Sequence, residues 1–177
     1  MITASHLPYN RNGMKFFSKE GGLDKADIKN ILLDSESVFS GNKYGSSQTL
    51  KLTEIYNNYL INIIRNKTGS EKPFLNKRII VDAGNGSGGF FVNILKELGA
   101  NTTGSVYLTP DGYFPNHIPN PENTQVMDGF SKQVLNVKAD LGIIFDTDVD
   151  RAAFVDKTGR AIAKNALVAL MSYIVSK

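Results

Sequence analysis

The chain has 177 residues, of which 41% are hydrophobic, so it is long enough to bury the core of one ordinary domain or of two small ones. Its net charge is only +3 without a basic block, which argues against a dedicated nucleic-acid-binding protein, and no apolar run approaches the ~18 residues of a transmembrane helix. The lack of cysteine excludes disulfides and Cys-based zinc sites, and the presence of only 2 histidines excludes a multi-histidine metal site.

The first half of the chain contains two predicted helices. Residues 23–39 carry apolar side chains at helix-compatible spacing. A stronger pattern covers residues 48–66, where apolar side chains recur at three- and four-residue steps and predict an amphipathic helix. The polar stretch 66–73 ends in a proline and indicates a domain boundary. We therefore expect one domain over residues 1–71 and a second over residues 72–177.

The second half alternates short apolar runs with helical patterns. Strands are predicted at residues 78–82, 101–107, 141–145 and 152–156, and helices at residues 89–98, 124–137 and 165–177. This alternation predicts an α/β fold whose mixed sheet is connected by helix crossovers.

A glycine-rich stretch at residues 84–89 formally matches the G-x-G-x-x-G motif of dinucleotide-binding folds. That motif also requires an acidic residue at the end of the next strand, ~20 residues further on. Tyr107 and Leu108 occupy that region, and Asp111 comes late. We therefore interpret the stretch as a tight strand-to-helix turn and expect no nucleotide cofactor. His117 is interpreted as a residue that packs within a loop rather than as a catalyst.

The run I-I-F-D-T-D-V-D-R at residues 143–151 is the most informative feature of the chain. Alternate residues of an extended segment point the same way, so an extended loop would bring Asp146, Asp148 and Asp150 together. Converging carboxylates repel one another unless a cation lies between them, and all-oxygen ligands favour a hard ion such as Mg²⁺. Arg151 indicates a second anion, because its planar fork matches phosphate oxygens.

The run D-T-D-V-D-R is also compatible with three other kinds of segment at first sight. An EF-hand loop needs Gly at its sixth position and Glu at its twelfth, where this chain has Arg151 and Lys157. The D-x-D pair could also hold a phosphatase nucleophile beside a metal. The simplest interpretation is a solvated acidic turn between two strands. We predict a magnesium site, because buried apolar residues run directly into the cluster.

The opening segment brings three reactive groups close together in sequence. Ser5 is a possible nucleophile, and His6 or Lys15 could move protons. Taken alone, neighbouring serine and histidine residues are more often part of a surface loop.

Together the two segments resemble the α-D-phosphohexomutase family, which includes phosphoglucomutase and phosphomannomutase. The residues T-A-S-H at 3–6 and N-G-M-K at 12–15 resemble the phosphoserine loop of that family, and D-T-D-V-D-R at 146–151 resembles its metal loop, usually D-G-D-x-D-R. Two intermediate stretches, 82–88 and 110–122, also fit, and all occur in the order of the family.

Two departures from the family pattern indicate a divergent branch. Leu7 replaces the usual Asn after Ser-His, and Thr147 replaces the usual Gly of the metal loop. The side chain of Thr147 restricts backbone freedom that a glycine would have. Neither change removes a predicted ligand or the predicted nucleophile.

The resemblance implies a mechanism and assigns residues to it. A phosphoserine would donate its phosphate to a hexose monophosphate, and the bisphosphorylated sugar would return its other phosphate, so that the 1- and 6-positions are exchanged. The implied catalytic residues are Ser5 as phosphate carrier, His6 and Lys15 for proton transfer, with Lys15 preferred, and Arg151 on a phosphate oxygen. The implied cofactor is Mg²⁺, held by Asp146, Asp148 and Asp150.

Full members of this family have four domains around one cleft, and the chain matches part of the first and most of the second. The expected partners are therefore a phosphosugar and the missing third and fourth domains, with no nucleic acid and no membrane. A truncated, non-catalytic module that binds a metal or phosphate is the alternative. A cytoplasmic location is expected, or an organelle if a targeting segment lies upstream.

Overall fold

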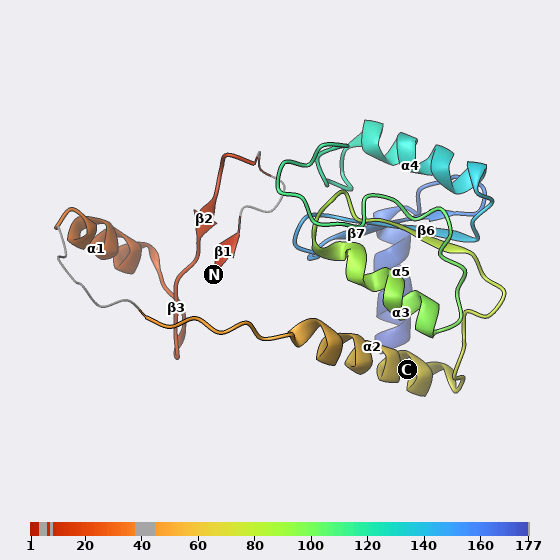
Figure 1. Cartoon of the computed structure of the whole chain (residues 1–177), viewed down its shortest axis with the longest axis horizontal. Helices are drawn as coiled ribbons and strands as arrows, with labels where there is room; N and C mark the ends of the chain where they lie inside the picture. The colour runs from red at the N-terminus through yellow and green to blue at the C-terminus, as the bar shows by residue number, and fades with distance from the viewer. Residues whose placement is uncertain (4–6, 8, 38–44, 177) are drawn as a thin grey trace.

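The computed structural model describes every residue except 4–6, 8, 38–44 and 177, and Figure 1 shows its course. The elements β1 to β4 and α1 lie to one side of a sheet domain that the later elements form (Figure 1). In chain order the elements are β1 (Ile2–Thr3), β2 (Gly13–Met14), β3 (Phe17–Ser18), β4 (Gly21–Gly22), α1 (Lys25–Ser35), α2 (Leu52–Thr68), β5 (Ile79–Asp82), the 3₁₀ helix η1 (Ser87–Phe90), α3 (Phe91–Glu97), α4 (Thr124–Asn136), β6 (Leu141–Phe145), β7 (Ala152–Asp156) and α5 (Lys164–Val175).

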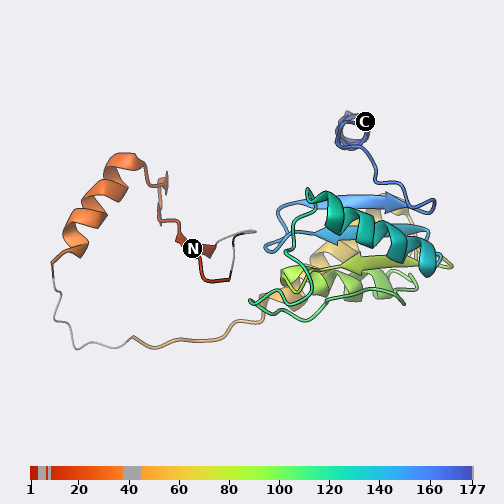
Figure 2. The same cartoon turned by 90° about the horizontal axis from the view of Figure 1, so that it is seen from above.

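The sheet that positions the candidate site has three strands in the order β5-β6-β7. β5 pairs parallel with β6, with Ile80 opposite Gly142, and β6 pairs antiparallel with β7, with Phe145 opposite Ala152. Helix α4 covers one face of the sheet, and α3 and α2 lie on the other (Figure 2). The predicted α/β fold with a mixed sheet and helix crossovers is therefore confirmed.

Alternation along the strands builds a core on each face. Successive side chains of a strand point to opposite faces, so one short apolar run supplies both layers. Ile79 and Val81 pack beneath α3 with Val92 and Leu95, whereas Ile80 packs beneath α4 with Phe130 and Val134. Burying each large aliphatic side chain contributes about 1.5–3 kcal/mol, which explains why β5 and β6 are apolar on both faces.

The strand predicted at residues 101–107 is wrong. Within that stretch only two isolated bridges occur, from Asn101 to Arg78 and from Val106 to Asp82. Between them the backbone turns, with the amide of Ser105 donating to the carbonyl of Thr102 over 3.1 Å. The turn passes through Gly104 at φ +105°, a conformation that glycine adopts readily and that interrupts a strand.

The part of the chain before the sheet domain is held mainly by local hydrogen bonds. β1 pairs antiparallel with β2, with Ile2 opposite Met14. Helix α1 begins at a capping box in which Asp24 accepts from the amide of Asp27 and the Asp27 side chain accepts in return. No residue of α1 is buried, so its stability does not come from packing. The helix predicted at residues 23–39 is present, with shorter bounds.

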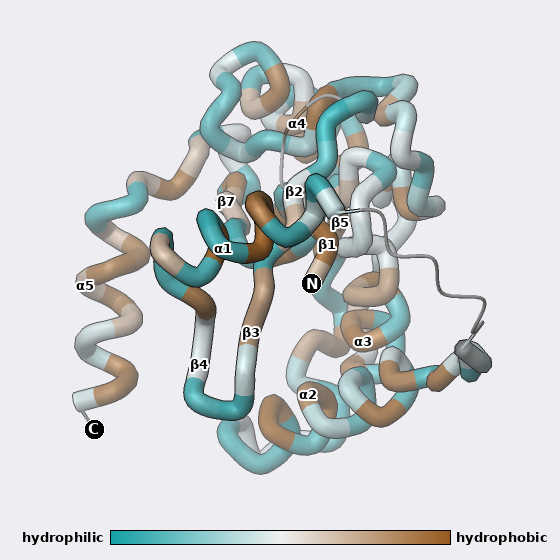
Figure 3. The backbone as a smooth tube through the Cα atoms, turned by 90° about the vertical axis from the view of Figure 1, so that its left-hand side faces the viewer, coloured by the Kyte–Doolittle hydropathy of each residue, from teal (hydrophilic) through white to brown (hydrophobic). Residues whose placement is uncertain are grey.

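Helices α2 and α5 differ in how they contact the sheet domain. α2 packs on α3 through Ile61, which meets Ile94 and Leu98, and it ends at Gly69 in the left-handed conformation. α5 projects beyond β7 (Figure 2) and has no buried residue; its apolar positions are visible in Figure 3. The domain boundary predicted between residues 71 and 72 stays a prediction. No helix in the described part of the chain has the length and apolarity that crossing a membrane requires.

Candidate active site

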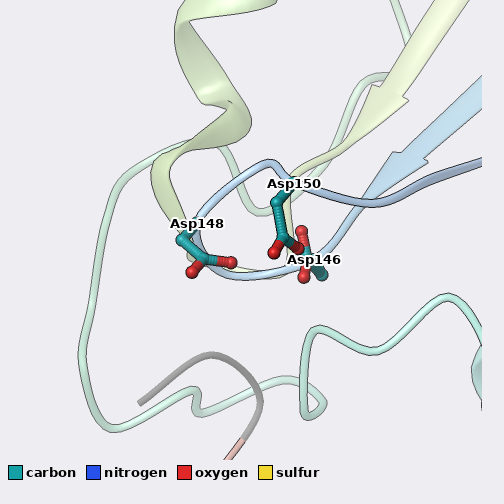
Figure 4. A group of neighbouring side chains, drawn as sticks. All are labelled: Asp146, Asp148 and Asp150. Atoms are coloured by element: carbon teal, nitrogen blue, oxygen red, sulfur yellow. The ribbon is translucent and has the colours of Figure 1, made fainter. Parts of the chain in front are cut away.

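Three carboxylates meet at the end of β6. One oxygen from each of Asp146, Asp148 and Asp150 lies within 4.8 Å of the others, and the three side chains gather along one side of the loop that joins β6 to β7 (Figure 4). Asp146 is fully buried, whereas Asp148 and Asp150 are exposed. The cluster thus has a buried base and a side open to solvent, through which a ligand could enter.

The carboxylates converge for a reason other than the predicted one. An extended loop was expected, but residues 147–150 form a turn and bends, and Val149 has a φ of +63°. The turn is closed by a hydrogen bond of 3.2 Å from the amide of Asp146 to the carbonyl of Arg151. Thr147 does not adopt a positive φ, so its place in this turn does not require a glycine.

Arg151 lies against the carboxylates at the base of the cluster. Both Nε and Nη2 of Arg151 are 2.9 Å from Oδ2 of Asp146, and Nε is 3.4 Å from Oδ1 of Asp150. The amide of Arg151 also donates to Oδ1 of Asp146 over 3.1 Å. The guanidinium therefore compensates part of the negative charge and fixes the orientation of the buried Asp146.

The environments of two of these carboxylates shift their acidity in opposite directions. Burial raises the pKa of Asp146, and a hydrogen bond with Asp150 adds to the rise. The same hydrogen bond lowers the pKa of Asp150, with further contributions from Arg151 and from the charge of Lys15. Three carboxylates within reach of one point form an all-oxygen donor set, which fits a hard divalent cation such as Mg²⁺.

The structure places one of the predicted residues of the opening segment near this cluster. Lys15 follows β2, and its amide and carbonyl both bond to Met1, each over 2.8 Å. Its charge acts on Asp150, as described above, although the two residues are far apart in sequence. In the same segment the ring of Tyr9 lies 5.1 Å from that of Tyr113, measured between centroids. Ser5 and His6 lie outside the described residues.

A second ionisable pair lies at the same edge of the sheet. Nε2 of His117 is 3.0 Å from Oδ2 and 3.1 Å from Oδ1 of Asp82, the last residue of β5, which is only 3% exposed. The hydrogen bond to Asp82 raises the pKa of His117. Sequence reasoning missed this pair. A usable signal was that Asp82 ends β5 and Asp146 follows β6, because the carboxyl ends of parallel neighbouring strands share one edge.

The glycine-rich stretch between β5 and α3 is a tight turn, as predicted. It contacts the metal loop directly, because the amide of Ser87 donates to the carbonyl of Thr147 over 2.8 Å. A Cβ atom on Gly86 would lie 2.8 Å from that same carbonyl oxygen and 2.9 Å from Cα of Thr147. Glycine is therefore required at position 86 by close approach of the two loops.

Comparison with known proteins agrees with this arrangement. Residues 54–159 match the model of the phosphoglucomutase/phosphomannomutase α/β/α domain II. The chain is 32% identical over 185 residues to a phosphoglucosamine mutase of Sulfurovum, covering 97% of this chain and 39% of that protein. It is 34% identical over 182 residues to a phosphoglucomutase/phosphomannomutase of Thermococcus kodakarensis, covering 97% of this chain and 38% of that protein.

A solved structure of a phosphoglucomutase/phosphomannomutase family protein from Burkholderia thailandensis shares the fold. It superposes with a TM-score of 0.75 at 24% identity, over 98% of this chain and 36% of the other. The chain thus spans less than half the length of the relatives that it matches. Because the domain model covers more than half of its residues, the chain belongs to the phosphoglucomutase/phosphomannomutase family.

Proposed function

We propose that the chain carries the phosphoserine loop and the metal loop of a phosphohexomutase, which interconverts hexose 1-phosphate and hexose 6-phosphate. The observation that supports this most is the convergence of Asp146, Asp148 and Asp150 within 4.8 Å, in a chain of this family. The charge of Lys15 lowers the pKa of Asp150, which adds support, because it links a residue of the opening segment to the cluster.

In the proposed reaction a phosphate on Ser5 is transferred to a hydroxyl of the bound hexose monophosphate. The bond between phosphorus and Oγ of Ser5 breaks as a bond from phosphorus to the sugar oxygen forms, and the proton of the sugar hydroxyl passes through a neutral Lys15, with His6 as the second candidate, to the departing Oγ of Ser5. The bisphosphorylated sugar then turns over and returns its other phosphate to Ser5. The phosphoserine is thereby regenerated, and no external phosphate donor is consumed.

The charges of the site suit this transfer. A phosphoserine carries nearly two negative charges, so its transfer needs positive groups around it. Mg²⁺ held by Asp146, Asp148 and Asp150 would supply charge neutralisation at a phosphate oxygen. Arg151 contributes its own positive charge from within the same loop, where its bonds to Asp146 keep it oriented.

Substrate choice belongs to parts of the protein that this chain does not contain. We propose that a phosphosugar and two further domains of a longer protein complete the site, and that the whole acts in the cytoplasm or in an organelle. Positioning supplies most of the rate enhancement in phosphoryl transfer, so those domains would contribute much of the activity.

The decisive experiment examines the phosphate carrier in the full-length protein. Mass spectrometry should find an added phosphate on the peptide that contains Ser5, and a coupled assay with glucose 1-phosphate should show that Ser5→Ala abolishes turnover. Ser18→Ala serves as the matched control, because Ser18 is an exposed serine of the same segment. Full activity in Ser5→Ala would reject the mechanism.

A second candidate is a truncated, non-catalytic module that binds a metal or phosphate. The observation in its favour is the coverage of only 39% and 38% of the two relatives. If a protein ending at this point is the mature product, it should bind Mn²⁺ without carrying phosphate on Ser5. Phosphate on Ser5 in the mature protein would exclude this candidate.

A further inference from the structure

Asn85 forms four hydrogen bonds with a single segment of the chain, residues 107–116. Its amide donates to the carbonyl of Tyr107, and its carbonyl accepts from the amide of Asp111, each over 2.8 Å. Its side-chain Nδ2 donates to the carbonyl of Thr109 over 2.8 Å, and its Oδ1 accepts from Nδ2 of Asn116 over 2.7 Å. Both backbone groups and both side-chain groups of this residue therefore hold the same loop.

The backbone of Asn85 explains why an asparagine suits this position. Its φ is +60°, in the left-handed region that only glycine and, to a lesser degree, asparagine and aspartate adopt easily. Glycine would meet the backbone requirement but would lose both side-chain hydrogen bonds. The variant Asn85→Gly can therefore keep the backbone conformation while it removes both side-chain hydrogen bonds.

The turn that contains Asn85 contacts one half of the proposed site directly and the other half through the loop that Asn85 holds. On one side, the next two residues, Gly86 and Ser87, lie against Thr147 of the metal loop. On the other side, the loop held by Asn85 carries Tyr113, whose ring lies 5.1 Å from the ring of Tyr9 in the opening segment. The turn is therefore the shared support of the metal loop and of the loop that contacts the opening segment.

We propose that Asn85 is a positioning residue, which sets the placement of the opening segment relative to the three aspartates. It acts through its hydrogen bonds to the loop that carries Tyr113. The functional meaning of this inference rests on the proposed phosphoryl transfer, in which a misplacement of about 1 Å can cost a factor of about 10² in rate. The geometric part can be tested without any activity.

Oxidative coupling of neighbouring tyrosines provides that test on the 177-residue chain. Photo-oxidation with a ruthenium tris-bipyridyl complex and persulfate joins closely placed tyrosine rings, and mass spectrometry of the monomer fraction quantifies the Tyr9–Tyr113 cross-link. The variant Tyr113→Phe lacks one of the two phenol groups, so it gives the background signal of the cross-linking measurement. Asn85→Gly should lower the yield by about fivefold or more, the order expected from the loss of two hydrogen bonds, whereas the overall fold by circular dichroism should be kept.

Asn76→Gly is the matched control, because Asn76 also has a positive φ, at +63°, but precedes β5 and so lies at the other end of that strand. It should leave the cross-link unchanged. If Asn85→Gly proves unfolded, Asn116→Ala removes only one of the bonds and should still lower the yield. Equal yields in Asn85→Gly and Asn76→Gly, or no cross-link in the parent chain, would overturn the proposal.

A second readout connects the placement to the metal loop. With Mn²⁺ as the probe, paramagnetic broadening of the NMR signals of Tyr9 and Lys15 should be strong in the parent chain and weaker in Asn85→Gly, with Mn²⁺ affinity retained. Unchanged broadening would contradict the proposal. If Mn²⁺ does not bind the parent chain, a metal site formed without phosphoserine is excluded, while the cross-linking result still decides the role of Asn85.

Discussion

His117 bridges two acceptors at the carboxyl end of β5: its Nε2 lies 3.0 Å from Oδ2 of Asp82, and its Nδ1 lies 3.1 Å from the carbonyl oxygen of Ile118. A carboxylate and a carbonyl can only accept, so both ring nitrogens bond well only when both carry protons. This arrangement favours the protonated ring, and the hydrogen bond to Asp82 raises the pKa of His117. The pair fastens the loop after Tyr113 to the sheet.

This pair predicts a pH-dependent contribution to stability. Because the pKa of His117 is raised above its ordinary value of 6.5, the contribution is complete below pH 6.5 and is lost as the pH rises through the folded-state value. His117→Gln should therefore destabilise the chain by about 1–3 kcal/mol at acidic pH, and by less at alkaline pH. Urea unfolding at a series of pH values measures the difference. His6→Gln, which removes the other histidine, should leave that dependence in place.

Removing one exposed carboxylate of the cluster should weaken metal binding. Asp148→Asn takes away one charge and one strong ligand, so we expect Mn²⁺ affinity, measured by isothermal titration calorimetry, to fall by about tenfold or more, equivalent to about 1.4 kcal/mol. Asp128→Asn makes the same change on the exposed side of α4 and should have no effect. Equal and negligible heats in the parent chain and in Asp148→Asn would exclude a metal site formed without phosphoserine.

The glycine-rich turn lies so close to the metal loop that a substitution in the turn should affect the loop, although it alters none of the three aspartates. Gly86→Ala would place a methyl group 2.8 Å from the carbonyl oxygen of Thr147, so one loop must move. We expect a loss of about 1–3 kcal/mol in stability and weaker binding of Mn²⁺.

Gly129→Ala is the contrasting control, because a Cβ there meets no atom within 4 Å and the position lies inside α4. That change should raise stability by about 0.5–1 kcal/mol and leave Mn²⁺ binding as it was. Similar Mn²⁺ affinity in both variants would show that the metal loop does not depend on the turn.

The 177-residue chain should have no measurable mutase turnover and should self-associate. The chain spans only 39% and 38% of two relatives, so we expect it to lack part of the positioning groups that phosphoryl transfer needs. In addition, α2 and α5 expose apolar side chains, among them Ile55, Tyr59, Leu170 and Ile174. A coupled assay with glucose 1-phosphate and added hexose bisphosphate, run beside light scattering, measures both properties. Robust turnover from a monodisperse monomer would contradict this prediction.

Three elements of the sheet domain, β5, β6 and α4, could be predicted from the sequence because they pack. β5 and β6 are short apolar runs because both of their faces are buried, and the apolar face of α4 shows in its spacing. The missed features depend on backbone conformation or on contacts between distant residues. The turn at Gly104 interrupts an otherwise plausible strand, and the pairing of Asp82 with His117 joins residues 35 positions apart. The apolar pattern of residues 101–107 did not reveal the turn, and no pattern within a short stretch of sequence could reveal the pairing.

The residue types of the metal loop were enough to predict that its three carboxylates converge. The extended conformation that was expected for the loop is wrong. The order of the three aspartates indicated their convergence, which the structure has, but a turn at Val149 produces it rather than an extended segment. Residues of the opening segment could be chosen only through the family resemblance, because a serine beside a histidine has no distinctive spacing. The charge of Lys15 lowers the pKa of Asp150, and the roles of Lys15, Ser5 and His6 stay predictions.

The hairpin that links β6 to β7 limits how this loop can change during evolution. Phe145 faces Ala152 across the pair, and the amide of Asp146 bonds to the carbonyl of Arg151, so the length of the loop is fixed at both ends. An inserted or deleted residue would either break this closure or shift β7 by one position, which turns its core-facing side chains toward solvent. A substitution at Thr147 keeps the length of the loop, and the backbone there has no positive φ that would require a glycine. Divergence in this family is therefore expected as replacement within the metal loop, and seldom as a change in its length.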